Sequence, residues 1–220
     1  MAIDGPAGSG KSTVAKLTAA KLNFRYLDTG AMYRVATLIS VMHHIPPEAE
    51  DALVEAVKLH SISFAYEGGD LRALLDETDV SDEIRTPALT NKVGPVCEIP
   101  GVRKLMGELQ RKMGEKGGVV LEGRDIGTVI FPGAEVKIYL DADPEERARR
   151  RFKELQQRGV KVDYYSVLND LLERDQRDKN RPVAPLRKAG DALIIDTTEM
   201  SVEEVVNEIV SQAQKYLERH

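Results

Sequence analysis

Residues 5–12 read GPAGSGKS and satisfy the spacing G-x-x-x-x-G-K-[ST] in full. Glycines at these positions let successive backbone N–H groups point at one anion, and Lys11 adds a charge for the β- and γ-phosphates of a nucleotide. The Ser12 hydroxyl can ligate Mg²⁺. Because such a loop forms between a β-strand and an α-helix, the pattern predicts that the fold begins with a strand, a phosphate-binding loop and a helix.

The sequence on either side of this loop partly meets that requirement. Thr13–Leu22 places Val14, Leu17 and Leu22 among alanines, which predicts an amphipathic helix beginning at the loop. The N-terminus of that helix would face the phosphates. Only Ala2–Asp4 remain upstream of the loop. A typical strand has about five or six residues, so we expect a short first strand.

Length and composition exclude several classes of protein. A chain of 220 residues can form one elaborated domain with inserted lobes and can bury a large apolar core. The net charge of −5 gives no general attraction to nucleic acid or to an anionic membrane, so an anion site must be built locally. Cys97 is the only cysteine, which excludes an internal disulfide and a thiolate zinc cage. No run of about 18 apolar residues occurs, and we expect a cytoplasmic protein.

Several short apolar runs, each followed by an acidic residue, alternate with helical patterns. This alternation is typical of a parallel sheet, whose ligands bind beyond the carboxyl ends of the strands. We therefore expect the acidic residues to lie along one edge of the sheet. The runs with their acids are Ala2–Ile3 with Asp4, Phe24–Leu27 with Asp28, Val119–Leu121 with Glu122, Val136–Leu140 with Asp141, and Leu193–Ile195 with Asp196.

In the middle of the chain, the spacing of apolar residues changes from a helical pattern to the alternation typical of strands. Ser61–Tyr66 and Leu71–Val80 alternate apolar and polar residues on either side of a turn at residues 67–70. This pattern predicts a small antiparallel lobe inserted in the α/β chain. The helices expected around it and at the end of the chain are one that Thr29-Gly30 caps, Glu48–His60, one from Thr90 to a stop at Gly117-Gly118, and Val202–Leu217.

A strongly charged helix is predicted after Asp143. Asp143 and the residues that follow it supply an N-cap, a proline in the first turn and a capping box. A row of arginines, Arg147, Arg151 and Arg158, then borders the apolar face of this helix. Gly159 marks a bend, which suggests a mobile lid whose guanidinium groups close on transferring phosphates. Taken without Gly159, the row of arginines is explained equally well as an ordinary solvent-exposed face of the helix.

Two further clusters combine cations and acids. Arg174, Asp178 and Arg181 have the i, i+4, i+7 spacing of one helix face, and Pro182 ends that helix; a ladder of ion pairs would give the same spacing. Residues 122–127, EGRDIG, place a cation and two acids at a strand end between glycines, where a ligand can approach closely. Packing of a turn is the alternative explanation for this second cluster.

Four segments of the sequence together resemble the bacterial cytidylate kinases, which belong to the nucleoside monophosphate kinases. The loop motif is shared by many families, whereas DTGAMYR and GRDIGTVIFP are far more particular. The resemblance extends over nearly the whole chain. Its segments are Gly5–Thr13, Asp28–Arg34, Glu122–Pro132 and Arg174–Leu186.

The resemblance implies the fold and the reaction of that family. The fold would be α/β, with a P-loop domain whose five-stranded parallel sheet is flanked by helices, a small antiparallel β insertion and a helical lid. The reaction would transfer the γ-phosphoryl group of ATP to CMP or dCMP with Mg²⁺, in a monomer without nucleic-acid or membrane partners. The core would comprise residues 1–28, 84–146 and 163–220, the monophosphate-binding region 29–83 with the insertion at about 61–82, and the lid 147–162.

The same resemblance assigns roles to individual residues. The catalytic residues would be Lys11, Arg151 and Arg158, and Ser12 would be the metal ligand. The ATP phosphates would lie against Gly5, Pro6, Ala7, Gly8, Ser9, Gly10, Lys11, Ser12 and Thr13. The substrate residues would be Arg34, Arg124 and Arg181 for the acceptor phosphate, Arg103 and Asp125 for the cytosine edge, Arg174 and Asp178 for the ribose, and Thr29 near the acceptor nucleotide.

Two other functions fit parts of the sequence. A kinase for a different monophosphate or for a hydroxy acid would share the loop, but a hydroxyl acceptor needs a general base. A phosphate acceptor needs none, because the second pKa of a phosphate monoester is about 6, and three arginines around an acceptor phosphate favour it. A GTPase-like switch would read guanine through N-K-x-D, and residues 91–94 read NKVG without the aspartate.

Overall fold

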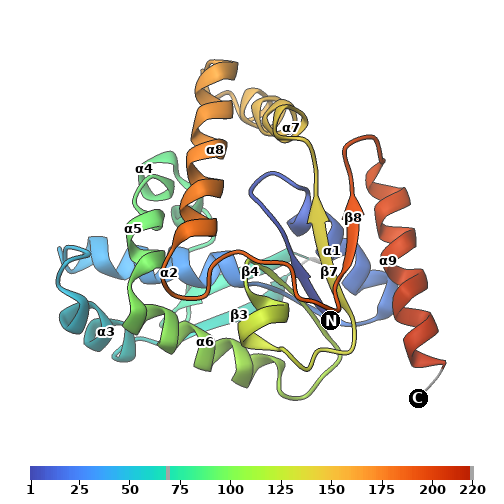
Figure 1. Cartoon of the computed structure of the whole chain (residues 1–220). Helices are drawn as coiled ribbons and strands as arrows, with labels where there is room; N and C mark the ends of the chain where they lie inside the picture. Colours follow the sequence, from blue (N-terminus) through green and yellow to red (C-terminus); the bar gives the residue numbers. More distant parts are fainter. Residues whose placement is uncertain (68–69, 219–220) are drawn as a thin grey trace. The chain divides into compact units, whose positions relative to one another are not determined.

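The computed structural model of the protein describes residues 1–67 and 70–218, which form two compact units (Figure 1). Unit 1 comprises Met1–Tyr26 and the chain from Gly117 on, and unit 2 comprises Leu27–Lys116. Gly68 and Gly69, which were expected in a turn, lie outside the described residues. None of the helices in the described ranges has the length and apolar character needed to cross a membrane.

Unit 1 is built on a five-stranded sheet with the strand order β2-β6-β1-β7-β8. β1 pairs in parallel with β6 and β7, and β7 pairs in parallel with β8, so that Ile3 lies between Glu122 and Ile138. The predicted parallel sheet is confirmed, including a first strand of only 3 residues. The strands are β1 (Ala2–Asp4), β2 (Arg25–Asp28, leading into unit 2), β6 (Val119–Gly123), β7 (Lys137–Asp141) and β8 (Leu193–Asp196).

α1 packs on this sheet, against β6 and β1, and α9 lies along α1 (Figure 1). α1 begins at Lys11 because Gly10, in the left-handed region at φ 86°, is its N-cap. α9 has the predicted bounds and begins with a capping box between Ser201 and Glu204. The helices are α1 (Lys11–Leu22), the π-helical turn η2 (Ile126–Ile130), α7 (Pro144–Gln157), α8 (Tyr164–Asn180) and α9 (Val202–Leu217).

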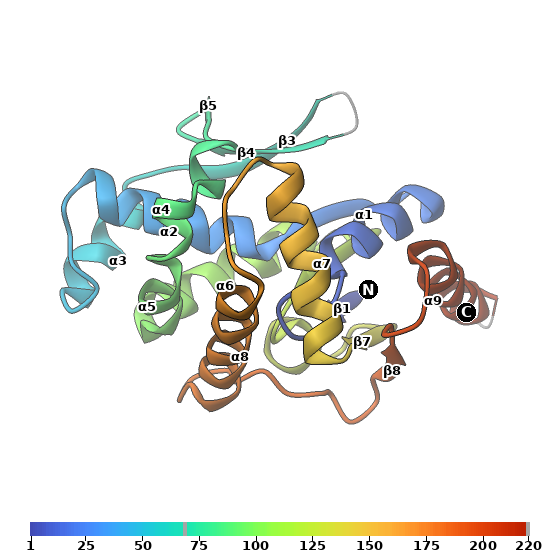
Figure 2. The same ribbon diagram turned by 90° about the horizontal axis from the view of Figure 1, so that it is seen from above.

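α7 and α8 form a helical hairpin joined by a loop that contains Gly159 (Figure 2). Ala148, Val167 and Leu171 are buried between them. The side chain of Asp143 caps α7 by accepting hydrogen bonds from the N–H groups of Glu145 and Glu146, at 2.8 and 3.4 Å. The predicted capping box is wrong at its second half, because the carboxylate of Glu146 pairs with arginines further along the helix, Arg149 and Arg150.

In the described part of unit 2, five α-helices surround a core in which Met32, Ile39, Leu53 and Met106 are fully buried. Its strands form a three-stranded antiparallel sheet, β3-β4-β5. The elements are α2 (Thr29–Met42), α3 (Glu50–Lys58), β3 (Ile62–Glu67), β4 (Asp70–Leu75), β5 (Thr78–Asp79), the 3₁₀ turn η1 (Glu83–Arg85), α4 (Pro87–Thr90), α5 (Val93–Glu98) and α6 (Pro100–Gly114).

Three predictions for unit 2 are wrong in detail. The stretch Leu71–Val80 is two strands, because Asp76 and Glu77 both take positive φ values, 48° and 69°, and turn the chain back. The helix expected from Thr90 to Gly117 is broken, because Ile99 is extended before the proline that starts α6. Asp28, one residue earlier than expected, caps α2 by accepting the N–H of Ala31 at 3.0 Å.

Candidate active site

The phosphate loop of unit 1 runs from the end of β1 to the start of α1. A side chain at Gly5 would bring its Cβ within 2.1 Å of the carbonyl oxygen of Leu140, so no other residue fits there. Gly8 has a φ of 76°, which side chains rarely adopt. The loop therefore depends on glycine at these two positions, of which the motif requires only Gly5.

Lys11 is buried, with an exposed fraction of 5%. Its Nζ donates to the carbonyl oxygen of Pro6 at 2.5 Å and to the Oγ of Ser9 at 3.3 Å. Burial and the positive charge of Arg124 lower the pKa of Lys11 to about 7. An ammonium group in such surroundings is stabilised by an incoming anion, since the anion offsets both the desolvation and the repulsion.

The two clusters at residues 122–127 and 174–181 meet in unit 1. The Nε of Arg124 donates to Asp178 at 2.8 Å, and the Nη2 of Arg181 donates to Asp125 at 3.2 Å. Arg181 also approaches Asp178 at 3.7 Å. Four of the five predicted substrate residues of unit 1 therefore form one network of two guanidinium groups and two carboxylates, and the fifth, Arg174, acts on Asp178 through its charge.

Arg124 and Asp178 hold each other in their ionised forms. Burial alone would lower the pKa of Arg124, but Asp178 and Glu122 raise it above its ordinary value. Burial alone would raise the pKa of Asp178, but Arg124 and Arg174 hold it below the usual range. The opposite charge of its neighbour therefore keeps each of these two buried groups ionised.

Asp4, at the end of β1, joins the phosphate loop to η2. Its carboxylate accepts the N–H groups of Ile126 and Gly127 at 2.9 and 2.7 Å. Burial raises the pKa of Asp4 to about 6, although both N–H groups act in the opposite direction. The sequence placed Asp4 at a strand end and did not show which residues it contacts.

The pKa of Asp4 predicts a pH effect on stability. Between about pH 4 and pH 6 the folded chain holds this proton more tightly than the unfolded chain, so the free energy of unfolding falls as the pH rises through that window. A shift of two pKa units corresponds to on the order of 3 kcal/mol. Urea unfolding at pH 4, 5 and 6 measures it, and Asp4→Asn should lose this part of the pH dependence. Equal slopes in both proteins would contradict the assignment.

The arginines of the predicted lid lie on the exposed side of α7. The Nη1 of Arg151 donates to Glu154 at 2.7 Å, and Arg158 approaches the same carboxylate at 3.7 Å. Exposed pairs of this kind contribute less than about 1 kcal/mol and are exchanged easily for a ligand. Arg147, the third member of the predicted row, is instead buried, so the row does not continue to the base of the helix.

The remaining predicted substrate residues belong to unit 2. The Nη1 of Arg34 donates to the carbonyl oxygen of Ile84 at 3.1 Å and to the hydroxyl of Thr90 at 2.8 Å. Arg103 is buried; it donates to the carbonyl oxygen of Cys97 at 3.1 Å and lies 5.4 Å from the centre of the Tyr33 ring. Thr29 is buried in the first turn of α2.

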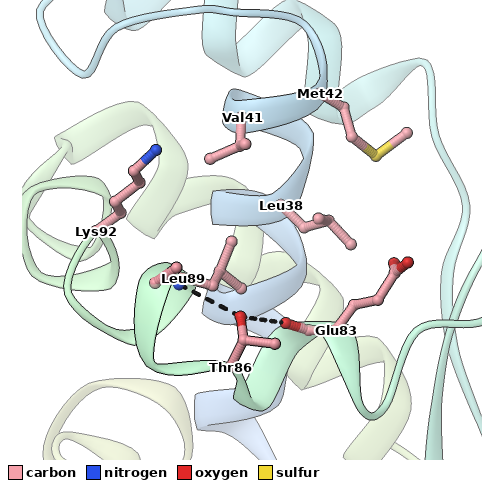
Figure 3. Close-up of a pocket in the computed structure, with 8 residues that line it drawn as sticks. Leu38, Val41, Met42, Glu83, Thr86, Leu89 and Lys92 are labelled. Carbon is pink, nitrogen blue, oxygen red and sulfur yellow. Dashed lines mark hydrogen bonds between the residues drawn. The ribbon is translucent and has the colours of Figure 1, made fainter.

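Unit 2 also has an open pocket of about 440 Å³ beside α2 (Figure 3). Leu38, Val41 and Met42 of α2 point into it, and Thr86 and Leu89 lie on the other side. Glu83 and Lys92 complete a lining that is otherwise mainly aliphatic and that suits an apolar group better than a phosphate. We therefore assign no part of the nucleotide site to this pocket.

Comparison with known proteins decides between the families that share a phosphate loop. The sequence profile of the family described as cytidylate kinase matches residues 1–215. This chain belongs to the cytidylate kinase family. The cytidylate kinase of Pectobacterium carotovorum subsp. carotovorum (strain PC1) is 45% identical over 215 residues, which is 98% of this chain and 96% of the relative. That of Bacillus pumilus (strain SAFR-032) is 47% identical over the same shares.

A solved structure supports the fold of this cytidylate kinase family member. The crystal structure of an uncharacterized protein from Eubacterium ventriosum ATCC 27560 has a TM-score of 0.53 at 15% identity and covers 97% of this chain and 96% of its own. At that identity the likeness concerns the fold alone. The α/β nucleoside monophosphate kinase fold and the family inferred from the four sequence segments are both confirmed.

Sequence reasoning missed two contacts that shape the site of this cytidylate kinase family member. Asp4 binds η2, and Arg147 binds Asp175 at 2.6 Å. Both contacts join residues far apart in the sequence, 122 and 28 positions respectively. The sequence offered one signal for these contacts. Arg147 lies in the first turn of a charged helix, next to the apolar face of that helix and not among its solvent-facing residues.

Proposed function

We propose that this member of the cytidylate kinase family transfers the γ-phosphoryl group of ATP to CMP or dCMP, giving ADP and CDP or dCDP. One observation carries the proposal: a buried Lys11 in a glycine loop lies in the field of Arg124 and Arg174. Glu122 and Asp178 offset part of this positive charge, and three cations grouped beside a glycine loop, in a protein of net charge −5, fit a multiply charged anion. The family supplies the identity of the two nucleotides.

The phosphate loop binds ATP in this proposal. The N-terminus of α1 points its first N–H groups at the phosphates, and Lys11 leaves Pro6 to neutralise the moving group. Ser12 is exposed in the first turn of α1 and offers the hard oxygen that Mg²⁺ prefers. With Mg²⁺ bound there, the ion would supply additional positive charge next to the phosphates.

The acceptor nucleotide is held by guanidinium groups. Arg34, Arg124 and Arg181 hold its phosphate, whose attacking oxygen is already ionised near neutral pH because its pKa is about 6. Positioning this oxygen in line with the γ-phosphorus is the main task of the protein. The other assignments are Arg103 and Asp125 on the cytosine edge, Arg174 and Asp178 on the ribose, and Thr29 beside the acceptor.

The lid completes the site by excluding water. Arg151 and Arg158 close on the transferring phosphoryl group, which suppresses hydrolysis of ATP when no acceptor is bound. The lid spans residues 147–162, between core segments 84–146 and 163–220, and residues 29–83 bind the monophosphate. We further propose that the protein acts as a monomer in the cytoplasm, in pyrimidine nucleotide metabolism.

The pKa of Lys11 predicts that ATP binding takes up a proton. The free ammonium has a pKa of about 7, and a nearby phosphate raises that pKa. ATP affinity should therefore fall as the pH rises from 7 to 9, by up to about tenfold per unit. Titration calorimetry at pH 8 in buffers of different ionisation enthalpy measures the uptake, with Lys11→Met as the control that lacks it. Uptake of the same size in both proteins would assign the proton elsewhere.

An acceptor panel tests the proposed function. ADP formation from ATP is measured with CMP, dCMP, UMP, AMP and shikimate at matched concentrations, together with the formation of each phosphorylated product. We expect kcat/KM for CMP and dCMP to exceed that for every other acceptor by at least about tenfold. Contacts with the cytosine base are sufficient for a preference of that size. Preference for AMP or shikimate would overturn the proposal in favour of another small-acceptor kinase. Binding of GTP more tightly than ATP would favour a guanine-nucleotide switch.

A further inference from the structure

Arg147 and Asp175 form a buried ion pair in unit 1. Their side chains are 4% and 7% exposed, and the Nη1 of Arg147 lies 2.6 Å from the Oδ2 of Asp175. Arg147 belongs to the first turn of α7, and Asp175 belongs to the second half of α8. The pair therefore joins the two helices of the hairpin at its base.

Both members of the pair also hold one residue of the phosphate loop. The Nη1 of Arg147 donates to the carbonyl oxygen of Ala7 at 2.8 Å, and the Oδ1 of Asp175 accepts the N–H of Ala7 at 3.2 Å. The Nε of Arg147 donates to the carbonyl oxygen of Ala142 at 3.0 Å, which fixes the plane of the guanidinium group. The polar backbone atoms of Ala7 are thus bound from two directions by side chains of distant elements.

The position of this pair is not explained by stability alone. The free energy needed to move two charged groups out of water is about as large as the free energy gained from their attraction. Apolar residues of similar size therefore often stabilise a protein equally well. Ala7 lies among apolar neighbours, Ala148, Val167 and Leu171, where such residues would fit. What an apolar pair cannot do is bind the N–H and the carbonyl group of Ala7 and so fix its peptide planes.

The phosphate loop needs such support from outside. Its glycines give the backbone wide conformational freedom, and a displacement of about 1 Å in a positioning group can cost a hundredfold in rate. A side chain added at Gly8, the neighbour of Ala7, would come within 3.2 Å of the Cβ of Arg147. The loop backbone therefore packs directly against the residue that binds it.

We propose that Arg147 and Asp175 are positioning residues that hold the phosphate loop in its ATP-binding conformation and anchor the base of the α7–α8 hairpin to it. The proposal rests on the proposed function in one respect, that the loop binds ATP. Neither residue is assigned a contact with nucleotide. Their effect passes through the peptide groups of Ala7.

Single substitutions test the contact with the loop. Asp175→Asn places an amide opposite the guanidinium group, and Arg147→Lys keeps the charge but loses the planar fork that reaches three acceptors. We expect each to weaken ATP binding by about tenfold to a hundredfold, with KM for CMP changed less than about twofold. Arg149→Met is the matched control, because Arg149 lies on the same helix with its side chain 66% exposed, and it should behave as wild type.

A double substitution separates positioning from stability. Arg147→Met with Asp175→Leu removes both charges, so the melting temperature should recover most of what either single substitution loses. The affinity for ATP should nevertheless stay about tenfold or more below wild type, because the peptide groups of Ala7 remain unheld. A double variant with wild-type affinity for ATP would overturn the proposal, and so would wild-type affinity in Arg147→Lys.

ATP affinity is measured directly, by calorimetry without an acceptor, so the result does not depend on the phosphorylated product. If the wild-type protein binds ATP but forms no CDP, the proposed function fails while the positioning test still gives its answer. If the variants bind ATP like wild type while wild type forms CDP, the positioning proposal fails and the function stands.

Discussion

Replacing Lys11 by methionine should lower kcat/KM for CMP-dependent ADP formation by about a thousandfold. Lys11 is the lysine of the phosphate loop, and its Nζ donates to two oxygens of that loop, at 2.5 and 3.3 Å. Methionine has nearly the same length but cannot neutralise the charge that moves between phosphates. A coupled assay for ADP at saturating CMP, with ATP varied, measures the loss.

Folding provides the control for this substitution. Because the pKa of Lys11 in the folded chain is below its ordinary value, the buried ammonium group destabilises the fold most at pH 7 and below, and this cost fades as the pH rises from about 7 to 10. The methionine variant should therefore unfold at the same urea concentration as wild type at pH 8, or at a higher one. An active methionine variant with ADP formation near the wild-type rate would remove Lys11 from the mechanism.

Replacing Arg124 by methionine should raise KM for CMP by about a hundredfold and lower kcat as well, with a smaller change in KM for ATP. Arg124 lies at the end of β6, where Asp178 binds its Nε at 2.8 Å and leaves the guanidinium group fixed in place. No flexible cation can replace a planar group held in this way. Initial rates with CMP and ATP varied independently separate the two constants.

The choice of control matters here, because the substitution also leaves Asp178 without its main partner. Without Arg124, only Arg174 and Arg181 offset the burial of Asp178, and its pKa should rise. Lys179→Met, one residue away on an exposed position of α8, tests for a general effect of lost charge and should keep wild-type constants. If Arg124→Met left KM for CMP unchanged, Arg124 would hold no acceptor phosphate.

The sequence predicted the parts of the fold that depend on local patterns. The loop motif, the apolar runs of the parallel sheet, the cap at Asp143 and the helix Val202–Leu217 each follow from neighbouring residues, and each is present in the structure. These predictions are reliable because the geometry of a phosphate loop or a helix cap depends on residues only a few positions apart. The two clusters of charged residues were also found, although not that they form one network.

Contacts between distant residues could not be predicted in this way. The spacing of Arg147 from the other arginines of its row is the same whether its side chain faces solvent or reaches Asp175. Only the packing of α7 on α8 determines which of these two positions the side chain takes. The turn at Asp76 and Glu77 escaped notice because neither residue is glycine or asparagine, the usual residues with positive φ. The break before α6 was missed because the apolar period continues across it.

The place of β1 in the sheet has a consequence for the order of events during synthesis. β1 is the central strand, yet both of its neighbours, β6 and β7, emerge from the ribosome roughly 115 residues or more behind it. At about 5–20 residues per second, the nascent chain waits several seconds or longer before its central strand can pair. Residues 27–116, made during that interval, have their own compact core and can fold first. The phosphate loop is thus translated well before the strands that complete its sheet and is among the last segments to take its final form.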